Sequence, residues 1–552
     1  MKKNISATLL TVSLFIITSK MAFATDYHLT PDDDWFQMLS ETNLQPGDKV
    51  ILANGTYSDS RRLSISHQGT EQAPIIIRSE NPGGAVLTRP NAQQNTINIE
   101  GAQHLVLQGL EITGGSIGIR ITSKMIDGTK HQAEFISIKE CHIHHTGDAA
   151  VAANIPGDTN NGHKFLSNEI HHTGGSGEGF YLGSNNDKRK STTSVFKNGL
   201  IEGNYIHHLD GPTISQGDGI EIKDGSYNNR VLNNVIHNTN YPGILVYGTD
   251  GNAPNIIEGN IIWSSGDNGI QAASEAVISN NIILSPGGSG IHSQNHQSAI
   301  PGSIKIIHNT IITNGSSTAI NIGHPTRATL SGPVVIANNA LYVIDTGLAL
   351  RLQNLPGFTV IGNIGVGEVQ PLRFFNDLAW NPNGNLDLDF VNWRNKDVFP
   401  ATGSLLIGKA YANITTANDF NKTKRNNSLD VGAYIYKPEG NPGWKIRRGF
   451  KISPRTSLDS DGDGIEDVQD NCINDANTNQ RDTDKNGYGN LCDGDLNNDG
   501  SVSFTDLDLL RASFGTDDPD ADFDGNGSVS FTDLEIFRKL FGKATGSEKI
   551  TE

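Results

Sequence analysis

The sequence predicts an all-β fold, a parallel β-helix in which the chain makes one solenoid coil per repeat. A phrase of Asn, any residue and an aliphatic residue recurs at intervals of 21 to 36 residues through the middle of the chain, and a period of that size is typical of solenoids. Between the phrases, short β-rich runs alternate with a period of two, whereas helical repeats would show a period of about 3.6. The phrase begins at Asn168, Asn204, Asn234, Asn260, Asn281, Asn309 and Asn339.

The recurring Asn has a structural interpretation. A side chain that takes the same place in every coil can hydrogen-bond to the backbone and to its copies in the coils above and below. We therefore expect this column of Asn side chains to hydrogen-bond the backbone polar groups at the turns of the solenoid.

The start of the chain has the pattern of a secretion signal. Lys2 and Lys3 precede an apolar run over residues 7–17, and Ala22 and Ala24 provide a small-residue cleavage site. We expect residues 1–24 to be removed, and the mature chain to be secreted to the cell exterior or the periplasm. No later apolar run approaches the ~20 residues of a membrane span, so none is expected.

Charge is unevenly distributed. The formal net charge is −18, and residues 458–543 hold 21 acidic and 6 basic residues. The rest is almost neutral, which excludes a basic nucleic-acid binder and assigns the acidic residues to a metal-binding tail. Cys472 and Cys492 both lie in this tail and can pair in an oxidising compartment, while Cys141 is expected to be a buried small hydrophobe.

The first coils carry a family resemblance. The runs over residues 44–57 and 73–83 resemble the opening coils of right-handed β-helix enzymes that act on polysaccharides, including the family of chondroitinase B and alginate lyases. This resemblance implies a right-handed parallel β-helix over residues 25–440. Residues 430–436 look like the closing strand of such a domain.

Each coil has a second strand with one buried face. Period two places Ile220, Ile244 and Ile270 inside, so the residues between them should point outward. We expect an exposed stripe of ionisable, amide and aromatic groups about 20 to 25 Å long, at about 4.8 Å per coil, which suits an extended polymer. The outward columns comprise Tyr181, Glu221, Leu245, Gln271 and His292, and, one step along, Lys223, Tyr247, Ala273 and Gln294. Of these, we expect Tyr181, Glu221, Gln271 and Gln294 to bind substrate.

Acidic residues beside glycine precede these strands at Asp148, Glu178, Asp218 and Asp267. Such residues can shape turns. Alternatively, Glu178, Asp218 and Glu221 hold Ca²⁺ or a sugar hydroxyl, because carboxylates on neighbouring coils lie within shared ligand range. Both interpretations remain open from the sequence.

Histidines follow the aliphatic residue of the repeated phrase, and we interpret most of them as stacked turn residues. These are His144, His145, His171, His172, His207, His208 and His237. His292 differs because it falls in the outward column, where residues 293–297 extend a polar rim beside it.

The outward columns contain the groups that β-elimination needs. Cleaving a uronic-acid polymer requires a group that neutralises the carboxylate, a base for the C5 proton and an acid for the departing oxygen. Residues 217–248 resemble the core of family-6 polysaccharide lyases, which implies that Glu221 is a metal or substrate ligand and Lys223 the base. Tyr247 stands where that family has an Arg, and a Tyr can transfer the second proton if Lys223 lowers its pKa. His292 is the remaining catalytic candidate.

We therefore expect a secreted lyase of an acidic, uronate-containing polysaccharide, and three other activities share the pattern. A glycoside hydrolase would use two carboxylates, which Asp218 with Glu221 or Asp267 can supply. A uronate epimerase shares the proton abstraction. A non-catalytic carbohydrate-binding or adhesin solenoid would present the same surface.

The chain then changes character. Residues 441–457 are rich in Gly, Pro and basic side chains, and we expect a linker or a basic latch against the acidic tail. Residues 458–493 alternate carboxylates on a Gly-bent loop, which supplies the oxygen ligands of Ca²⁺. Their order and paired Cys resemble a thrombospondin type 3 repeat. The expected ligands there are Asp459, Asp461 and Asp463.

Two further loops follow in residues 494–543, before a tail at 544–552. Each has oxygen ligands at loop positions 1, 3, 5 and 12, has Gly at position 6, and runs into the same Ser-Val-Ser-Phe-Thr-Asp-Leu sequence. This duplication resembles a type I dockerin, which implies two Ca²⁺ ions and a cohesin-like partner. The expected ligands are Asp495, Asn497, Asp499 and Asp506, then Asp522, Asp524, Asn526 and Asp533.

Overall fold

The computed structural model describes residues 24–185, 193–297, 299–315, 317–323, 329–426, 428–451, 461, 463, 465, 470–499 and 501–542. Residues 1–23 of the predicted secretion signal, the predicted ligand Asp459 and the tail at 544–552 lie outside the described residues. The chain divides into two compact units, Met1–Ser453 and Pro454–Glu552.

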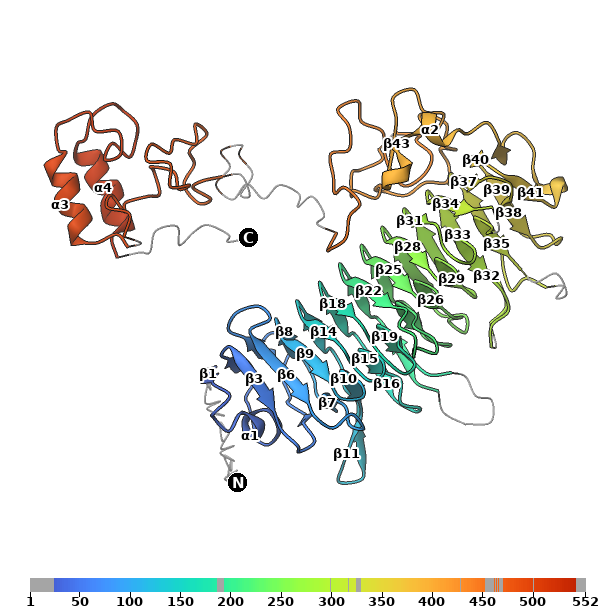
Figure 1. Ribbon diagram of the computed structural model, residues 1–552, viewed down its shortest axis with the longest axis horizontal. Helices are drawn as coiled ribbons and strands as arrows, with labels where there is room; N and C mark the ends of the chain where they lie inside the picture. Colours follow the sequence, from blue (N-terminus) through green and yellow to red (C-terminus); the bar gives the residue numbers. More distant parts are fainter. Residues whose placement is uncertain are drawn as a thin grey trace, which may run out of the picture. The chain divides into compact units, whose positions relative to one another are not determined.

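The first unit is a solenoid whose described residues form three long sheets of parallel strands (Figure 1). We number the sheets in the order in which a coil enters them. Sheet 1 comprises β1 (Asp26–Leu29), β2 (Lys49–Leu52), β5 (Ile75–Ser79), β8 (Leu105–Gln108), β13 (Ser137–Lys139), β17 (Lys164–Leu166), β21 (Leu200–Glu202), β24 (Arg230–Leu232), β27 (Asn255–Glu258), β30 (Ala276–Ser279), β33 (Ile304–Ile307), β36 (Val334–Ala337) and β39 (Phe358–Ile361). Sheet 2 comprises β3 (Gly55–Ser58), β6 (Ala85–Arg89), β9 (Glu111–Gly114), β14 (His142–His144), β18 (Glu169–His171), β22 (Tyr205–Leu209), β25 (Val235–Thr239), β28 (Ile261–Ser265), β31 (Ile282–Leu284), β34 (Thr310–Asn314), β37 (Ala340–Ile344), β40 (Asn363–Val366) and β42 (Trp380–Asn381). Sheet 3 comprises β4 (Ser64–Ile65), β7 (Ile97–Glu100), β10 (Ile119–Thr122), β15 (Val151–Ala153), β19 (Phe180–Leu182), β23 (Ile220–Ile222), β26 (Ile244–Val246), β29 (Ile270–Ala272), β32 (Ile291–Ser293), β35 (Ile320–Ile322), β38 (Leu348–Leu352) and β41 (Glu368–Gln370).

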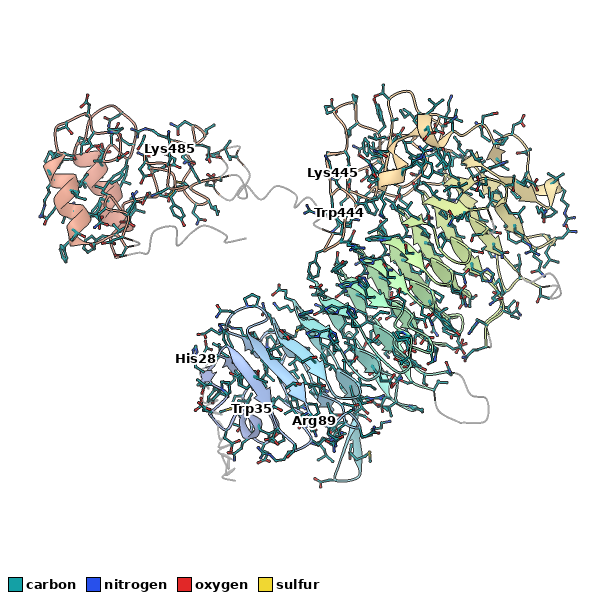
Figure 2. All side chains as sticks on the ribbon, viewed as in Figure 1. His28, Trp35, Arg89, Trp444, Lys445 and Lys485 are labelled. Carbon is teal, nitrogen blue, oxygen red and sulfur yellow. A yellow bond between two sulfur atoms is a disulfide. The ribbon has the colours of Figure 1, made fainter. Side chains whose placement is uncertain are left out.

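The predicted parallel β-helix is confirmed, and its core is the inside of the coils. Alternate residues of each strand point inward and pack against their copies in the next coil, as Ile220, Ile244 and Ile270 do in sheet 3. The short helix α1 (Trp35–Ser40) buries Trp35 and Leu39 in the same core at the N-terminal coils, where Figure 2 labels Trp35.

The Asn column forms the hydrogen-bonded ladder that the repeated phrase predicts. The backbone N–H of Asn234 donates to Asn260 Oδ1 at 2.9 Å, and the Asn234 side-chain amide donates to the same oxygen at 2.9 Å. Each amide also donates to a carbonyl of the preceding coil, as Asn260 does to Val231 O at 2.9 Å. The ladder continues to Asn363, one coil beyond the last predicted member. Because these buried polar groups are all paired, the ladder holds the coils in register.

Smaller elements project from the solenoid or follow it. They are the antiparallel pair β11 (Lys124–Ile126) and β12 (Thr129–His131), the parallel pair β16 (Thr159–Asn161) and β20 (Val195–Lys197), the antiparallel pair β43 (Phe390–Asn392) and β44 (Asp397–Pro400), α2 (Leu386–Asp389), and the 3-10 turns η1 (Leu372–Phe374) and η2 (Trp393–Asn395).

The chain after the last coils folds back onto the outer face of sheet 2. Residues 430–436, expected to be a closing strand, form no strand, and Val431 and Tyr434 pack against aromatic and aliphatic side chains of sheet 2. The start of the expected linker is also packed. Trp444 (Figure 2) is buried in the same cluster, and the Lys451 amine donates to Asn233 Oδ1, Gly259 O and Phe420 O at 2.8 to 3.0 Å. The basic composition of this segment therefore includes a buried amine that donates to two oxygen atoms of the solenoid and to Phe420 O.

The described residues of the second unit form two helices, α3 (Phe504–Ala512) and α4 (Phe531–Leu540), each starting with a Ser–Asp capping box. Val502, Leu510, Phe523 and Phe537 form its small core. Cys472 and Cys492 form the expected disulfide, and Cys141 of the first unit is free and buried. In the part of the chain that the structure describes, no helix combines the length and apolar character needed to cross a bilayer.

Candidate active site

The predicted columns on sheet 3 stack as the period of two requires. Tyr181 pairs with Glu221, Glu221 with Leu245, Leu245 with Gln271, and Gln271 with His292 on successive strands from β19 to β32. The column extends beyond the predicted residues, to Arg120 and Ala152 before Tyr181 and to Asn321 after His292. The outward direction of these side chains is therefore correct.

The predicted exposure is wrong for the middle of the columns, whereas Tyr181, His292 and Gln294 are half-buried. Lys223 and Tyr247 are 3% and 4% exposed, and Glu221, Gln271 and Ala273 are also buried. A second layer of side chains covers them. The His296 ring lies edge-on over the Tyr247 ring at 4.5 Å between centroids, and Gln271 Nε2 lies 3.4 Å from His296 Nδ1. Alternation along a strand specifies which way a side chain points, but it does not reveal a loop from another coil that lies on top.

Lys223 lies at the centre of this covered patch. Its amine forms an ion pair with Glu221 Oε1 and lies 3.3 Å from the Tyr247 hydroxyl. The rings of Tyr181 and Tyr247 flank it, with centroids 4.9 and 5.0 Å from Nζ. The predicted convergence of Lys223 and Tyr247 from adjacent coils is thus present, with Tyr181 as a second aromatic wall. We call this group the Lys223 patch.

Three carboxylates lie beside the Lys223 patch. Ligand oxygens of Glu178, Asp218 and Glu221 all lie within 4.8 Å of one another, and all three residues are buried. Glu178 and Asp218 enter from the turns before β19 and β23, and Gly219 lets neighbouring coils approach, because a Cβ there would lie 2.4 Å from the Gly243 carbonyl oxygen. The sequence left open whether these acidic residues shape turns or share a ligand. In the structure, the three carboxylates are close enough to bind one ligand together.

The carboxylates are poised to accept a cation. Burial raises the pKa of Glu178 to about 7 and the pKa of Asp218 well above its usual range. Burial also raises the pKa of Glu221, although Lys223 opposes this shift. Glu178 Oε1, both Asp218 oxygens and Glu221 Oε2 are buried without a hydrogen-bond partner among the described residues. Clustered, partnerless carboxylate oxygens are the donor set that Ca²⁺ prefers, so these residues fit that ion.

Tyr247 does not have the lowered pKa that the sequence suggested. Burial, followed by the charges of Glu221 and Asp218, raises its pKa above the usual range. Its hydroxyl also donates to Glu221 Oε1 at 3.4 Å. Lys223 does not outweigh these effects, so Tyr247 keeps its proton at neutral pH and is equipped as a proton donor rather than as a base.

The remaining predicted residues lie around this patch. His292 and Gln294 are half-buried, on and just after β32, and Asp148 and Asp267 are outside the carboxylate cluster. Two residues that the prediction did not assign also belong here. His296 contacts Tyr247 and lies in the polar rim noted beside His292, while Arg120 is found only by extending the outward column two coils before Tyr181.

The predicted calcium ligands of the second unit are gathered in loops. Asp522, Asp524 and Asp533 bring ligand oxygens within 4.8 Å of one another, as do Asp461, Asp463 and Asp470 in the disulfide-bonded segment. In the first of the two acidic loops, over residues 495–506, Asp499 N donates to Asp495 Oδ1 at 3.0 Å and Asn497 N to Asp506 Oδ1 at 3.1 Å. The second loop repeats both bonds at Asn526 and Asp524.

Two family models match the chain. The chondroitinase B model matches residues 37–173, and the right-handed β-helix region model matches residues 159–341. No curated protein matches the chain. Together the two models span most of the solenoid, including all of the coils that form the Lys223 patch.

The solved structures similar to this chain include polysaccharide lyases. A mannuronic acid specific family 6 lyase from human gut microbiota is 17% identical, with 65% of this chain and 91% of that chain covered, at a TM-score of 0.45. The pectate lyase Pel9A is 14% identical, with coverage of 76% and 98% and a TM-score of 0.46. The family PL6 alginate lyase AlyGC is 16% identical, with coverage of 77% and 60% and a TM-score of 0.42. Likeness at this level does not identify a substrate. By these matches the solenoid is a right-handed β-helix, and its first coils match the family model of chondroitinase B.

Proposed function

We propose that the chain cleaves an acidic, uronate-containing polysaccharide by β-elimination at the Lys223 patch. The observation that carries this proposal is that the buried Lys223 amine and Tyr247 phenol on sheet 3 lie beside three buried carboxylates. A hydrolase needs two carboxylates but has no use for the amine–phenol pair. The elimination reaction uses all of these groups.

In the proposed reaction, Lys223 acts in its neutral form, without the proton that its ion pair with Glu221 holds, and its amine removes the C5 proton of the uronate. The electron pair of that C–H bond forms the C4–C5 double bond as the bond from C4 to the glycosidic oxygen breaks. The Tyr247 hydroxyl gives its proton to the departing oxygen, which becomes a hydroxyl group. The short separation of Nζ and the phenol oxygen, 3.3 Å, lets both act on adjacent carbons of one sugar.

The carboxylate cluster supports the remaining role. Glu178, Asp218 and Glu221 would hold a Ca²⁺ ion, which supplies positive charge that neutralises a uronate carboxylate and so acidifies its C5 proton.

We propose that the polymer runs along the outward column of sheet 3 and approaches from Tyr181. Tyr181 is half-buried, whereas Lys223 and Tyr247 are covered from the His296 side. Arg120 follows in the same column beyond the small residue Ala152, so its guanidinium can bind the carboxylate of a further uronate. His292, Gln271 and Gln294 would line the other end.

Product analysis tests the reaction class. The purified chain is incubated with alginate, chondroitin, hyaluronan, pectate, ulvan and fucoidan while the ultraviolet absorbance of unsaturated uronate is recorded. Absorbance that Lys223→Ala abolishes supports the lyase. New reducing ends without absorbance would indicate hydrolysis, inversion at C5 without chain cleavage an epimerase, and binding without any product a carbohydrate-binding solenoid.

We further propose that the chain is secreted and that its second unit is a calcium-loaded module of the thrombospondin type 3 and dockerin kinds. The oxygen clusters at Asp461, Asp463 and Asp470 and at Asp522, Asp524 and Asp533 support this, together with the disulfide. The dockerin-like pair of loops and helices would bind a cohesin-like partner. Pull-down of a cohesin domain in Ca²⁺, lost on chelation, tests that interaction.

A further inference from the structure

The outer face of sheet 2 carries a ladder of imidazoles that the proposed reaction does not use. We call His142, His144, His145, His171, His172, His207, His208 and His237 the histidine ladder. His144, His171, His207 and His237 occupy one register column on strands β14 to β25. Their rings stack, with centroids 5.1 Å apart for His144 and His171 and 4.8 Å for His171 and His207.

Backbone geometry explains only part of the ladder. His145, His172 and His208 have positive φ of 51°, 51° and 53°, as a turn position requires. Asn238 and Ser264 fill the same position in the next coils with φ of 55°, so the turn does not select imidazole. The strand position does not require imidazole either, because the residue that follows His237 in this column is Trp263.

The ring nitrogens of the early coils converge with carboxylates. His142 Nε2 lies 2.7 Å from His171 Nε2, and His144 Nε2 lies 3.2 Å from Glu111 Oε1. Two sets of possible ligands result, Glu111 with His142 and His144, and His142 with Glu169 and His171, each with ligand atoms within 4.8 Å of one another. His142 is common to both sets, and all five residues are half-buried and so within reach of an ion from solvent.

Little movement would bring the His142 and His171 rings into position to bind one ion. Two nitrogens bound to one tetrahedral ion at about 2.05 Å would be about 3.3 Å apart, so His142 and His171 need to separate by only about 0.6 Å.

We propose that His142, His171 and Glu169 bind a divalent transition-metal ion of the Zn²⁺ or Cu²⁺ type on sheet 2. Two imidazoles and one carboxylate with an open position are a ligand set typical of such ions, and Ca²⁺, which prefers oxygen ligands, would not compete for it. The bound ion would link coils β14 and β18 on a face different from the sheet that carries the Lys223 patch. Glu111, His142 and His144 are the alternative ligand set for the same ion.

The test is titration of the full, untagged chain with ZnCl₂, and separately with CuCl₂, in excess Ca²⁺ so that the acidic loops are occupied. We expect one equivalent to bind and the melting temperature of the solenoid to rise, because the ion binds only the folded state. His142→Gln removes a ligand from both sets and should weaken binding at least about tenfold. His237→Gln, at the far end of the ladder and in neither set, is the matched control and should bind as the unmodified chain does.

Two further variants locate the ion and guard against misfolding. Glu169→Gln should weaken binding and Glu111→Gln should not if the proposed set is correct, and the reverse result would overturn this assignment. Circular dichroism and melting without metal check that each variant is folded. Equal Zn²⁺ affinity in the unmodified chain and a folded His142→Gln variant, or displacement of Zn²⁺ by millimolar Ca²⁺, would refute the site.

Discussion

The amine of Lys223 and the hydroxyl of Tyr247 lie 3.3 Å apart although 24 residues separate them in the chain, because both follow an inward-pointing residue on adjacent strands of sheet 3. Lys223→Ala and Tyr247→Phe should each lower kcat by about 10² or more, the usual effect of one proton-transfer role, with folding unchanged. Initial rates on the substrate found by screening measure this effect. Lys305→Ala and Tyr241→Phe, at exposed positions, are matched controls. Full activity of Tyr247→Phe would move the acid role to His292.

Calcium dependence should follow the carboxylate cluster. Asp218→Asn removes the carboxylate whose two oxygens are both buried without a hydrogen-bond partner in the described part of the chain, so it should abolish the activation by Ca²⁺ that we expect of the chelated, unmodified chain. Activity against free Ca²⁺ concentration is the measurement. Asp267→Asn, next to glycine but outside the cluster, serves as the control. A chelator-treated chain with unchanged kcat would argue against a metal in the reaction.

His163 should make the solenoid acid-sensitive. The ring is fully buried, Ile136 N donates to its Nδ1 at 3.1 Å, and burial lowers the pKa of His163 from 6.5 to about 3. Since the unfolded chain binds the proton more readily, stability is complete above pH 6.5 and falls as the pH drops from 6.5 toward 3. The loss at pH 4.5 should be about 2 to 3 kcal/mol.

His163→Asn provides the comparison for this pH effect, because Asn229 and Asn255 occupy the same place in later coils and accept the same kind of backbone bond. Melting temperatures at pH 4.5 and 7.5 should differ less in this variant. His131→Asn, on an exposed strand, should keep the full difference.

One Asn of the ladder should matter far more than its size suggests. Asn260→Ala removes the oxygen that accepts from the Asn234 backbone and side-chain N–H groups, and it removes the amide that donates to the Val231 carbonyl inside the solenoid. We expect a loss of about 2 to 5 kcal/mol in the free energy of unfolding, measured by denaturant titration. Asn383→Ala, in an exposed turn, should change stability by less than about 0.5 kcal/mol.

The second unit should be dispensable for catalysis. Truncation after Ser453 should leave kcat/KM on a soluble polymer within about threefold, because the unit boundary follows Ser453. Truncation after residue 440 should instead destabilise the solenoid, since it removes Trp444 and Lys451 from their buried sites. Complete loss of activity in a folded chain of residues 25–453 would contradict the separation.

Periodicity in the sequence predicts the solenoid well because each coil repeats the same strands and the same Asn position. The Asn ladder and the inward Ile columns need only a period and the alternation of a strand. The same rules predict that Lys223 meets Tyr247, since both residues lie in or directly beside regular strands. They do not predict that His296 covers Tyr247, because that contact depends on an irregular loop. The nearness of Lys223 predicts a lowered pKa for Tyr247, yet the pKa rises because burial and two carboxylates act together, which no pairwise pattern reveals.

The Asn ladder has a consequence for how such a molecule changes over evolutionary time. Each Asn side-chain oxygen accepts hydrogen bonds from the coil before it, and each side-chain nitrogen donates to the oxygen of the coil after it. Every Asn of the ladder therefore forms the same hydrogen bonds to its neighbouring coils. A whole coil can be gained or lost between two rungs without creating a mismatched seam. The spacing of the rungs, from 21 to 36 residues, varies only through the loops between strands. The number of coils and the loops between strands can therefore change while the backbone scaffold stays the same. The length of polymer that the proposed site could bind would change with them.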